Sequence, residues 1–172
     1  MKSHKLPHEF PEFNREVRSS WETNADFWND QMGEGNSFHN TLIRPSQEKL
    51  LALEPEEKVL DIACGNGHFA RQIVEFGVTV VGIDVSTRQI QNAAAASREF
   101  GDRLHFMVGD ATDESILAQF GKDRFDAISC GMAIMDMAEI EPLAASVAYL
   151  LKPTGRFVFT TMHPAFNSPN GL

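Results

Sequence analysis

A short apolar run that leads into a glycine turn and then a helical pattern constrains this chain more than any other feature. The run ends near Asp61, the turn contains Gly65 and Gly67, and residues 68–76 follow with helical spacing. Glycines let the backbone turn sharply and approach a ligand, and the helix start presents free N–H groups. A carboxylate four residues before Gly65 would repel a pyrophosphate and attract an amino group. The stretch therefore predicts a strand, a loop that binds a nucleotide-type cofactor, and a helix.

Two later apolar runs also end in acids. Residues 78–83 lead to Asp84, and residues 104–108 lead to Gly109 and Asp110. An acid at the tip of the second strand is placed to bond a ribose diol. Asp110 is suited to accept a hydrogen bond from an adenine amino group. The glycine pattern alone also fits a dinucleotide fingerprint, so a nicotinamide-dependent oxidoreductase is an alternative, which leaves Asp61 and Asp110 unexplained.

Taken in order, these motifs resemble the class I S-adenosylmethionine-dependent methyltransferases. In that family D-x-x-x-G-x-G, an acid ending the second strand and an acid after the third recur, and the resemblance runs from about residue 36 to the last residue. It implies an α/β, Rossmann-like fold with a doubly wound, mostly parallel sheet, and S-adenosylmethionine as cofactor. It also implies that Asp61, Gly65 and Gly67 surround the methionine part, that Asp84 holds the ribose, and that Asp110 with Ala111 reads the adenine.

Residues beside these motifs complete the expected cofactor site. They are Ala63, Cys64, Asn66, Val85 and Cys130, with Trp28 and His39 from the N-terminal segment. Trp28 either covers the cofactor or belongs to the buried face of its helix, and His39 either lines the site or lies in a solvated loop. Both cysteines are expected as free thiols. We expect no metal, because Cys-x-x-Cys and Cys/His zinc spacings are absent.

The chain of 172 residues with 42% hydrophobic content suits one domain. We expect residues 1–13 to form a disordered tail and residues 14–172 to form the domain, with an N-terminal helical segment at 14–56 and the Rossmann-like core at 57–172. Apolar side chains at helical spacing predict a lid or flanking helix over about residues 15–32. Gly77 is expected to cap the helix over 68–76, and Ser86-x-x-Gln89 to open the next helix as a capping box. Further helices are predicted over about 114–120 and from Pro142 to about 151.

The chain stops soon after its fifth predicted strand, residues 156–161, whereas the resembled family adds another helix and an antiparallel pair of strands. We therefore expect a fold truncated after about strand five, with an apolar sheet edge left uncovered. Either a homodimer forms across that edge, or the chain is a shortened version of a longer protein.

Net charge and hydropathy limit the classes of molecule that this chain is expected to bind. The formal net charge of −9 with only 15 Lys and Arg disfavours a nucleic-acid interface. No apolar run approaches the roughly 20 residues needed to cross a bilayer, so we expect a cytoplasmic protein without a membrane partner. A small or neutral methyl acceptor fits these features.

Methyl transfer from a sulfonium needs an acceptor held in line about 3–3.5 Å away, and sometimes a base. His163, after the fifth strand, is either an acceptor-side base or a loop residue bonded to backbone. Asp136, beyond the fourth strand, is either a substrate contact or a capping or solvated aspartate. The leading hypothesis is transfer of a methyl group to a small molecule; a protein that binds the cofactor without catalysis is the alternative from another class.

Overall fold

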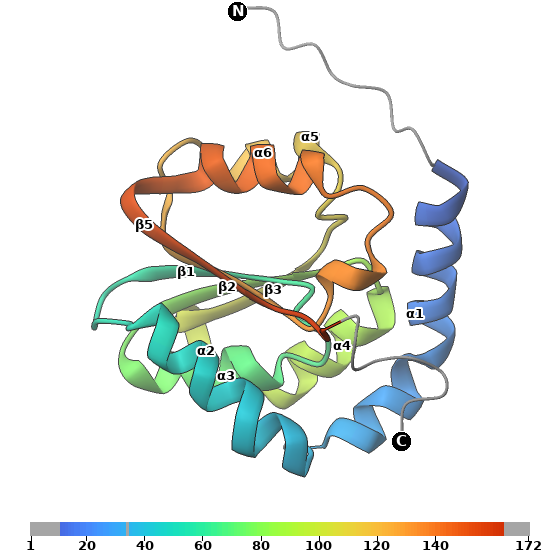
Figure 1. The fold of residues 1–172 in the computed structure, drawn as a ribbon. Helices are drawn as coiled ribbons and strands as arrows, with labels where there is room; N and C mark the ends of the chain where they lie inside the picture. Colours follow the sequence, from blue (N-terminus) through green and yellow to red (C-terminus); the bar gives the residue numbers. More distant parts are fainter. Residues whose placement is uncertain (1–10, 34, 164–172) are drawn as a thin grey trace, which may run out of the picture.

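A computed structural model describes residues 11–33 and 35–163, so the tail expected at residues 1–10 lies outside the described residues. Its centre is a five-stranded parallel sheet in the order β3-β2-β1-β4-β5 (Figure 1). The strands are β1 (Lys58–Ile62), β2 (Thr79–Asp84), β3 (Leu104–Val108), β4 (Phe125–Gly131) and β5 (Leu151–Thr160). This order and direction confirm the doubly wound α/β fold.

Helices cover both faces of the sheet. On one face lie α2 (Arg44–Leu51), α3 (His68–Ile73) and α4 (Thr87–Ala96), and on the other α5 (Glu114–Leu117) and α6 (Glu141–Leu150) (Figure 1). Successive strand residues point to opposite faces. Accordingly Val59 belongs to one buried core cluster, and Leu60 and Ile62 belong to the other. Because both faces are buried, the strands are continuous apolar runs instead of alternating ones.

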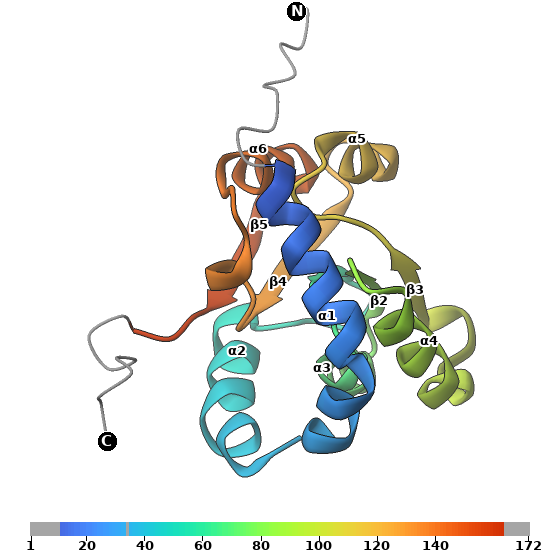
Figure 2. The same cartoon turned by 90° about the vertical axis from the view of Figure 1, so that its right-hand side faces the viewer.

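Helix α1 (Pro11–Met32) lies across the sheet's carboxyl edge, where strand-to-helix loops gather (Figure 2). It begins four residues before Arg15, so the expectation that residues 11–13 belong to a disordered tail is wrong. Pro11 suits the first turn of a helix, where its missing N–H costs nothing, and Glu12 complements the helix dipole. Between α1 and α2, residues His39–Ile43 form a short π-helix, η1.

The expected helix boundaries around β2 are confirmed. Gly77 ends the turn after α3 with φ 83°, and Ser86 caps α4 by accepting a hydrogen bond from the Gln89 N–H at 3.1 Å. The reciprocal bond of a capping box is absent from the described contacts because the Ser86 N–H donates to Asp84 Oδ1 at 2.9 Å. The helices expected over 114–120 and from Pro142 onward are present as α5 with a following 3-10 turn, and as α6.

Strand β5 begins at Leu151, directly after α6, five residues earlier than expected. Its pairing with β4 is irregular before Ala127 meets Arg156, and regular from there on. The irregular part contains Pro153, which cannot donate to a ladder, and Thr154 with φ 70°. In the described sheet β5 is an edge strand, and Phe159 is 49% exposed on it. Dimerisation across this edge stays a prediction. None of the helices in the described ranges is long and apolar enough to cross a membrane.

Candidate active site

The loop after β1 depends on two glycines. Gly65 and Gly67 have φ values of 54° and 72°, which other residues adopt only with strain. A Cβ on Gly67 would lie 2.5 Å from Phe106 Cζ, whereas a Cβ on Gly65 would meet nothing within 4 Å. Gly67 is therefore needed for close packing, and Gly65 leaves the loop open on its outer side, where a ligand can approach.

Asp84, at the end of β2, ties two loops together. Its Oδ2 accepts from the Gly65 N–H at 2.9 Å and its Oδ1 from the Ser86 N–H at 2.9 Å. Burial raises the pKa of this carboxyl above its usual range, although the two N–H donors oppose the shift. The carboxylate thus shapes the glycine loop and the start of α4, and it also lines a cavity.

Asp61, at the carboxyl half of β1, is the most deeply placed acid of the site. It is 3% exposed, and its Oδ1 accepts a hydrogen bond of 2.7 Å from Ser129 Oγ on β4. Burial raises the pKa of Asp61 from 3.8 to about 7, with a further contribution from the negative charge of Asp84. A buried carboxylate with no cation among its described contacts is suited to a positively charged ligand group.

Asp110 follows β3 and is held by its own loop. The N–H and the Oγ1 hydroxyl of Thr112 donate to Asp110 Oδ1 at 2.9 and 2.7 Å. Arg18 of α1 lies 3.9 Å from Asp110 Oδ2. Among the described contacts, Asp110 Oδ2 takes part only in this long ion pair, so it is available to a ligand.

One side of α1 carries polar residues that contact all three strand-end loops. Asn14 Nδ2 donates to Thr112 Oγ1 at 3.3 Å, and Glu22 Oε2 accepts from Ser86 Oγ at 2.7 Å. Farther along, Asn29 Oδ1 accepts from Asn66 Nδ2 at 3.3 Å. Sequence reasoning identified only the apolar face of this helix. The four-residue spacing of Asn14, Arg18 and Glu22 is the signal that would have placed them on one side.

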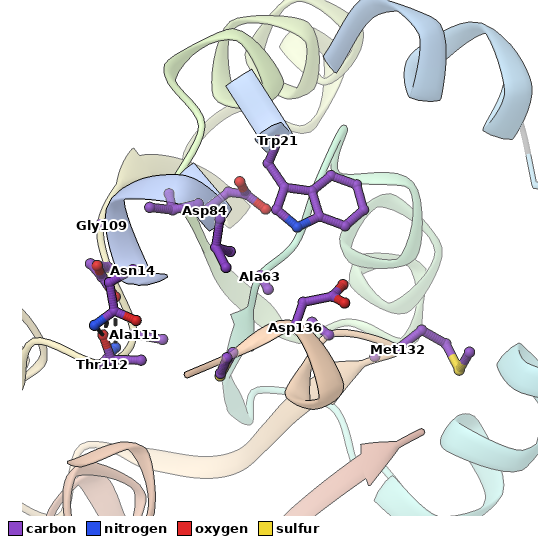
Figure 3. Close-up of a pocket in the computed structure, with 15 residues that line it drawn as sticks. Asn14, Trp21, Ala63, Asp84, Gly109, Ala111, Thr112, Met132 and Asp136 are labelled. Atoms are coloured by element: carbon purple, nitrogen blue, oxygen red, sulfur yellow. Dashed lines mark hydrogen bonds between the residues drawn. The ribbon is translucent and has the colours of Figure 1, made fainter. Parts of the chain in front are cut away.

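Two cavities meet under α1. The smaller, of about 150 Å³, is lined among others by the expected adenosine-side residues Asp84, Val85, Asp110 and Ala111. The larger, of about 580 Å³, is lined among others by the expected cofactor residues Asp61, Cys64, Asn66, Trp28 and His39. The two share Trp21, Ala63, Gly131, Met132 and Asp136. Figure 3 shows Trp21 from α1 and Asp136 from the turn after β4 on opposite sides of the shared space, with the carboxylate of Asp136 directed toward the indole.

Four of the expected site residues line neither cavity: Gly65, Gly67, Cys130 and His163. Cys130 is 0% exposed and packs in the core on one face of the sheet, where burial raises the pKa of its thiol to about 12. His163 is exposed and is not among the lining residues. Its role as a base therefore gains no support from this geometry, whereas Asp136 lies at the junction, where burial raises its pKa.

A histidine pair borders the larger cavity. The rings of His39 and His68 pack edge to face with centroids 5.0 Å apart, and His68 Nε2 lies 3.0 Å from Gln72 Nε2. Burial lowers the pKa of His39, and burial together with the neighbouring His39 lowers the pKa of His68 to about 4. Both imidazoles are therefore neutral near pH 7. The described residues contain no cluster of three potential metal ligands.

Comparison with known proteins identifies the family. A family model described as "Methyltransferase domain" matches residues 53–168. An uncharacterised methyltransferase of Synechocystis is 31% identical over 122 residues, which are 68% of this chain and 52% of that protein. A ubiquinone biosynthesis O-methyltransferase of Histophilus somni is 28% identical over 169 residues, 94% of this chain and 66% of the relative. The chain belongs to the methyltransferase domain family.

Solved structures agree with this placement. An S-adenosylmethionine-dependent methyltransferase from Mesorhizobium loti superimposes with a TM-score of 0.64 at 27% identity, covering 73% of this chain and 56% of that one. The chain thus spans about half to two thirds of the length of these relatives.

Proposed function

We propose that this chain binds S-adenosylmethionine across the two joined cavities and transfers its methyl group to a small-molecule acceptor. One observation carries the proposal: acids from three adjacent strands border two connected spaces, with buried Asp61 in the larger and Asp84 with Asp110 in the smaller. An amino group suits Asp61, a ribose diol suits Asp84, and an adenine amino group suits Asp110. Methyltransferases with the same domain support the assignment.

The chain's own residues position the ligands. The bound cofactor supplies a methyl group on a positively charged sulfur, which is already activated for displacement. Asp61 and the glycine loop would fix one end of the cofactor, and Asp84 with the Asp110 loop the other, so the methyl group would lie at the junction beside Trp21 and Asp136. Orientation supplies most of the acceleration in such a reaction, since reacting atoms held in line replace a random encounter. Asp136 would accept the proton that the acceptor releases.

Helix α1 forms one wall of the larger cavity and contacts the three loops at the strand ends. Trp28 and His39 contribute to this space from α1 and η1. We assign them to the walls around the methionine part and the acceptor, because neither lines the smaller cavity.

Isothermal titration of the purified chain with S-adenosylmethionine, S-adenosylhomocysteine and NAD tests the cofactor. Binding of both adenosyl ligands without NAD supports the proposal, and NAD binding alone would favour the oxidoreductase. Transfer of label from methyl-labelled cofactor to a panel of small acceptors then tests catalysis. Tight cofactor binding with no transfer to any acceptor class would identify a cofactor-binding protein without this activity.

A further inference from the structure

The walls of the larger cavity are largely apolar. Aromatic rings come from Trp21, Trp28, Phe38 and Phe69, and thioethers from Met32, Met132, Met135 and Met162. Such side chains accept flat or irregular apolar molecules and give affinity through buried area. A cavity of about 580 Å³ has room for an acceptor in addition to the end of the cofactor.

The charge of this cavity opposes an anionic acceptor. No Lys or Arg is among its lining residues in the described part of the chain, whereas Asp61 and Asp136 both are. The nearby cations are engaged elsewhere: Arg44 Nε lies 2.7 Å from Glu48 Oε1, and Arg71 Nη1 donates to the Asn66 carbonyl at 2.7 Å. A carboxylate or phosphate brought into this space would lose its water without gaining a positive partner.

A buried amide beside the junction has a donor without a hydrogen-bond partner among the described residues. Gln47 of α2 is 1% exposed and lines the larger cavity, and its Nε2 has no hydrogen-bond partner within residues 11–33 and 35–163. It lies against the end of β4, where a Cβ on Gly131 would be 2.9 Å from Gln47 Nε2. Gly131 borders both cavities. A buried donor left unpaired costs about 1–3 kcal/mol, so a ligand oxygen at this point would recover that loss.

The mouth of the cavity is apolar as well. Trp28, Phe38, Met135 and Met162 line the cavity and are 40%, 52%, 37% and 43% exposed. They come from α1, the segment before η1, the turn after β4 and the segment after β5. An apolar acceptor therefore meets compatible side chains from the surface down to the junction.

We propose that the acceptor is a largely apolar molecule without negative charge that presents a hydroxyl oxygen to Gln47 Nε2 beside the junction. The inference rests on the proposed methyl transfer and names its substrate class. In the reaction, the hydroxyl oxygen forms a bond to the methyl carbon, and the carbon–sulfur bond breaks with its electron pair kept by sulfur. The hydroxyl proton passes to the carboxylate of Asp136, which lines the same junction.

Three matched probes test the substrate class: 4-ethylphenol, ethylbenzene and 4-ethylbenzoate. Each is titrated into the protein saturated with S-adenosylhomocysteine, and the fluorescence of Trp21 and Trp28 is followed. These are the chain's two tryptophans, and both line the cavity. We expect 4-ethylphenol to bind at least ten times more tightly than the benzoate, and at least five times more tightly than ethylbenzene. Equal or tighter binding of 4-ethylbenzoate overturns the proposal.

Substitution of Gln47 by Leu tests the hydroxyl contact. We expect the preference for 4-ethylphenol over ethylbenzene to disappear, while the affinity for S-adenosylhomocysteine stays within twofold. Gln119→Leu, at an exposed position outside both cavities, is the matched control and should keep the preference. An unchanged preference in Gln47→Leu, or a loss of S-adenosylhomocysteine affinity instead, overturns the role of Gln47.

A second variant covers the case in which Gln47→Leu does not fold. Met135→Lys places a cation at the exposed mouth and should increase the affinity for 4-ethylbenzoate at least fivefold, whereas Met135→Leu should not. No gain in Met135→Lys would contradict the electrostatic argument. If the folded wild-type chain fails to bind S-adenosylhomocysteine in the preceding titration, the proposed function itself falls, and this inference with it; binding of S-adenosylhomocysteine without selective 4-ethylphenol binding overturns the inference alone.

Discussion

The carboxyl of Asp61 should destabilise the folded, cofactor-free chain at alkaline pH, and Asp61→Asn should remove that cost. Burial raises its pKa from 3.8 to about 7, and each unit corresponds to 1.36 kcal/mol. The folded state therefore holds this proton more tightly than the unfolded state. The resulting stabilisation is complete below about pH 4 and is lost as the pH rises through about 7, so that at pH 8 the cost is about 4 kcal/mol.

Asparagine keeps the shape of the side chain and an Oδ1 that can accept from Ser129 Oγ, but it carries no charge. We expect Asp61→Asn to increase the free energy of unfolding, with the gain growing by about 2–3 kcal/mol between pH 5 and pH 8. Urea denaturation at both values, followed by circular dichroism, measures this. Asp102→Asn, at an exposed position, is the control and should show no such growth. A gain that is the same at both pH values, or a loss at pH 8, would refute the reasoning.

Three further substitutions test the loops and the helix above them. Asp84→Ala should weaken S-adenosylhomocysteine binding at least tenfold in a calorimetric titration, because it removes the proposed ribose partner and two loop hydrogen bonds; unchanged affinity would reject the ribose role. Gly67→Ala should lower the free energy of unfolding by about 2 kcal/mol or more, since its methyl group would meet Phe106 at a strained φ; a chemical denaturation curve like that of the wild type would contradict this. Glu22→Gln should speed amide hydrogen exchange in α1 several-fold and leave β1 unchanged, because the hydrogen bond from Ser86 Oγ that lowers the pKa of Glu22 loses its charged acceptor; equal exchange in α1 would show that this contact does not hold the helix.

The sheet and the cofactor loops could be predicted because their signals are local. An apolar run bounded by glycine and an acid specifies a strand and its tip over a few residues, as at Asp61 and Asp84. The start of α4 could be predicted for the same reason, because the Ser86 hydroxyl accepts a hydrogen bond from the N–H of Gln89, only three residues later. The sequence predicts β5 only from Arg156, because Pro153 and Gly155 are residues typical of a turn. In the structure, pairing with β4 extends the strand through both of them.

The acceptor side of the site could not be predicted in the same way, because it depends on contacts between distant segments. Gln47 lies in an ordinary amphipathic helix, and only the fold brings its amide against Gly131, 84 positions later in the sequence. His163 follows a strand that ends near the site, yet its side chain is exposed and lines neither cavity. The position of a residue relative to a strand end does not fix the direction of its side chain.

The buried carboxyls of Asp61 and Asp84 lower the stability of the free chain, and the same groups suit the binding of a cation. Asp61 and Asp84 lie close enough that the charge of one raises the pKa of the other, and both are buried beneath α1, which supplies no cation to either among the described contacts. A fold selected for stability alone would pair or replace such groups. Their cost is understandable if a bound cation completes the site, because an ammonium group beside Asp61 turns an unpaired buried carboxylate into a compensated pair. The same carboxylates that weaken the free chain would then make its affinity depend on the positive charge of the cofactor.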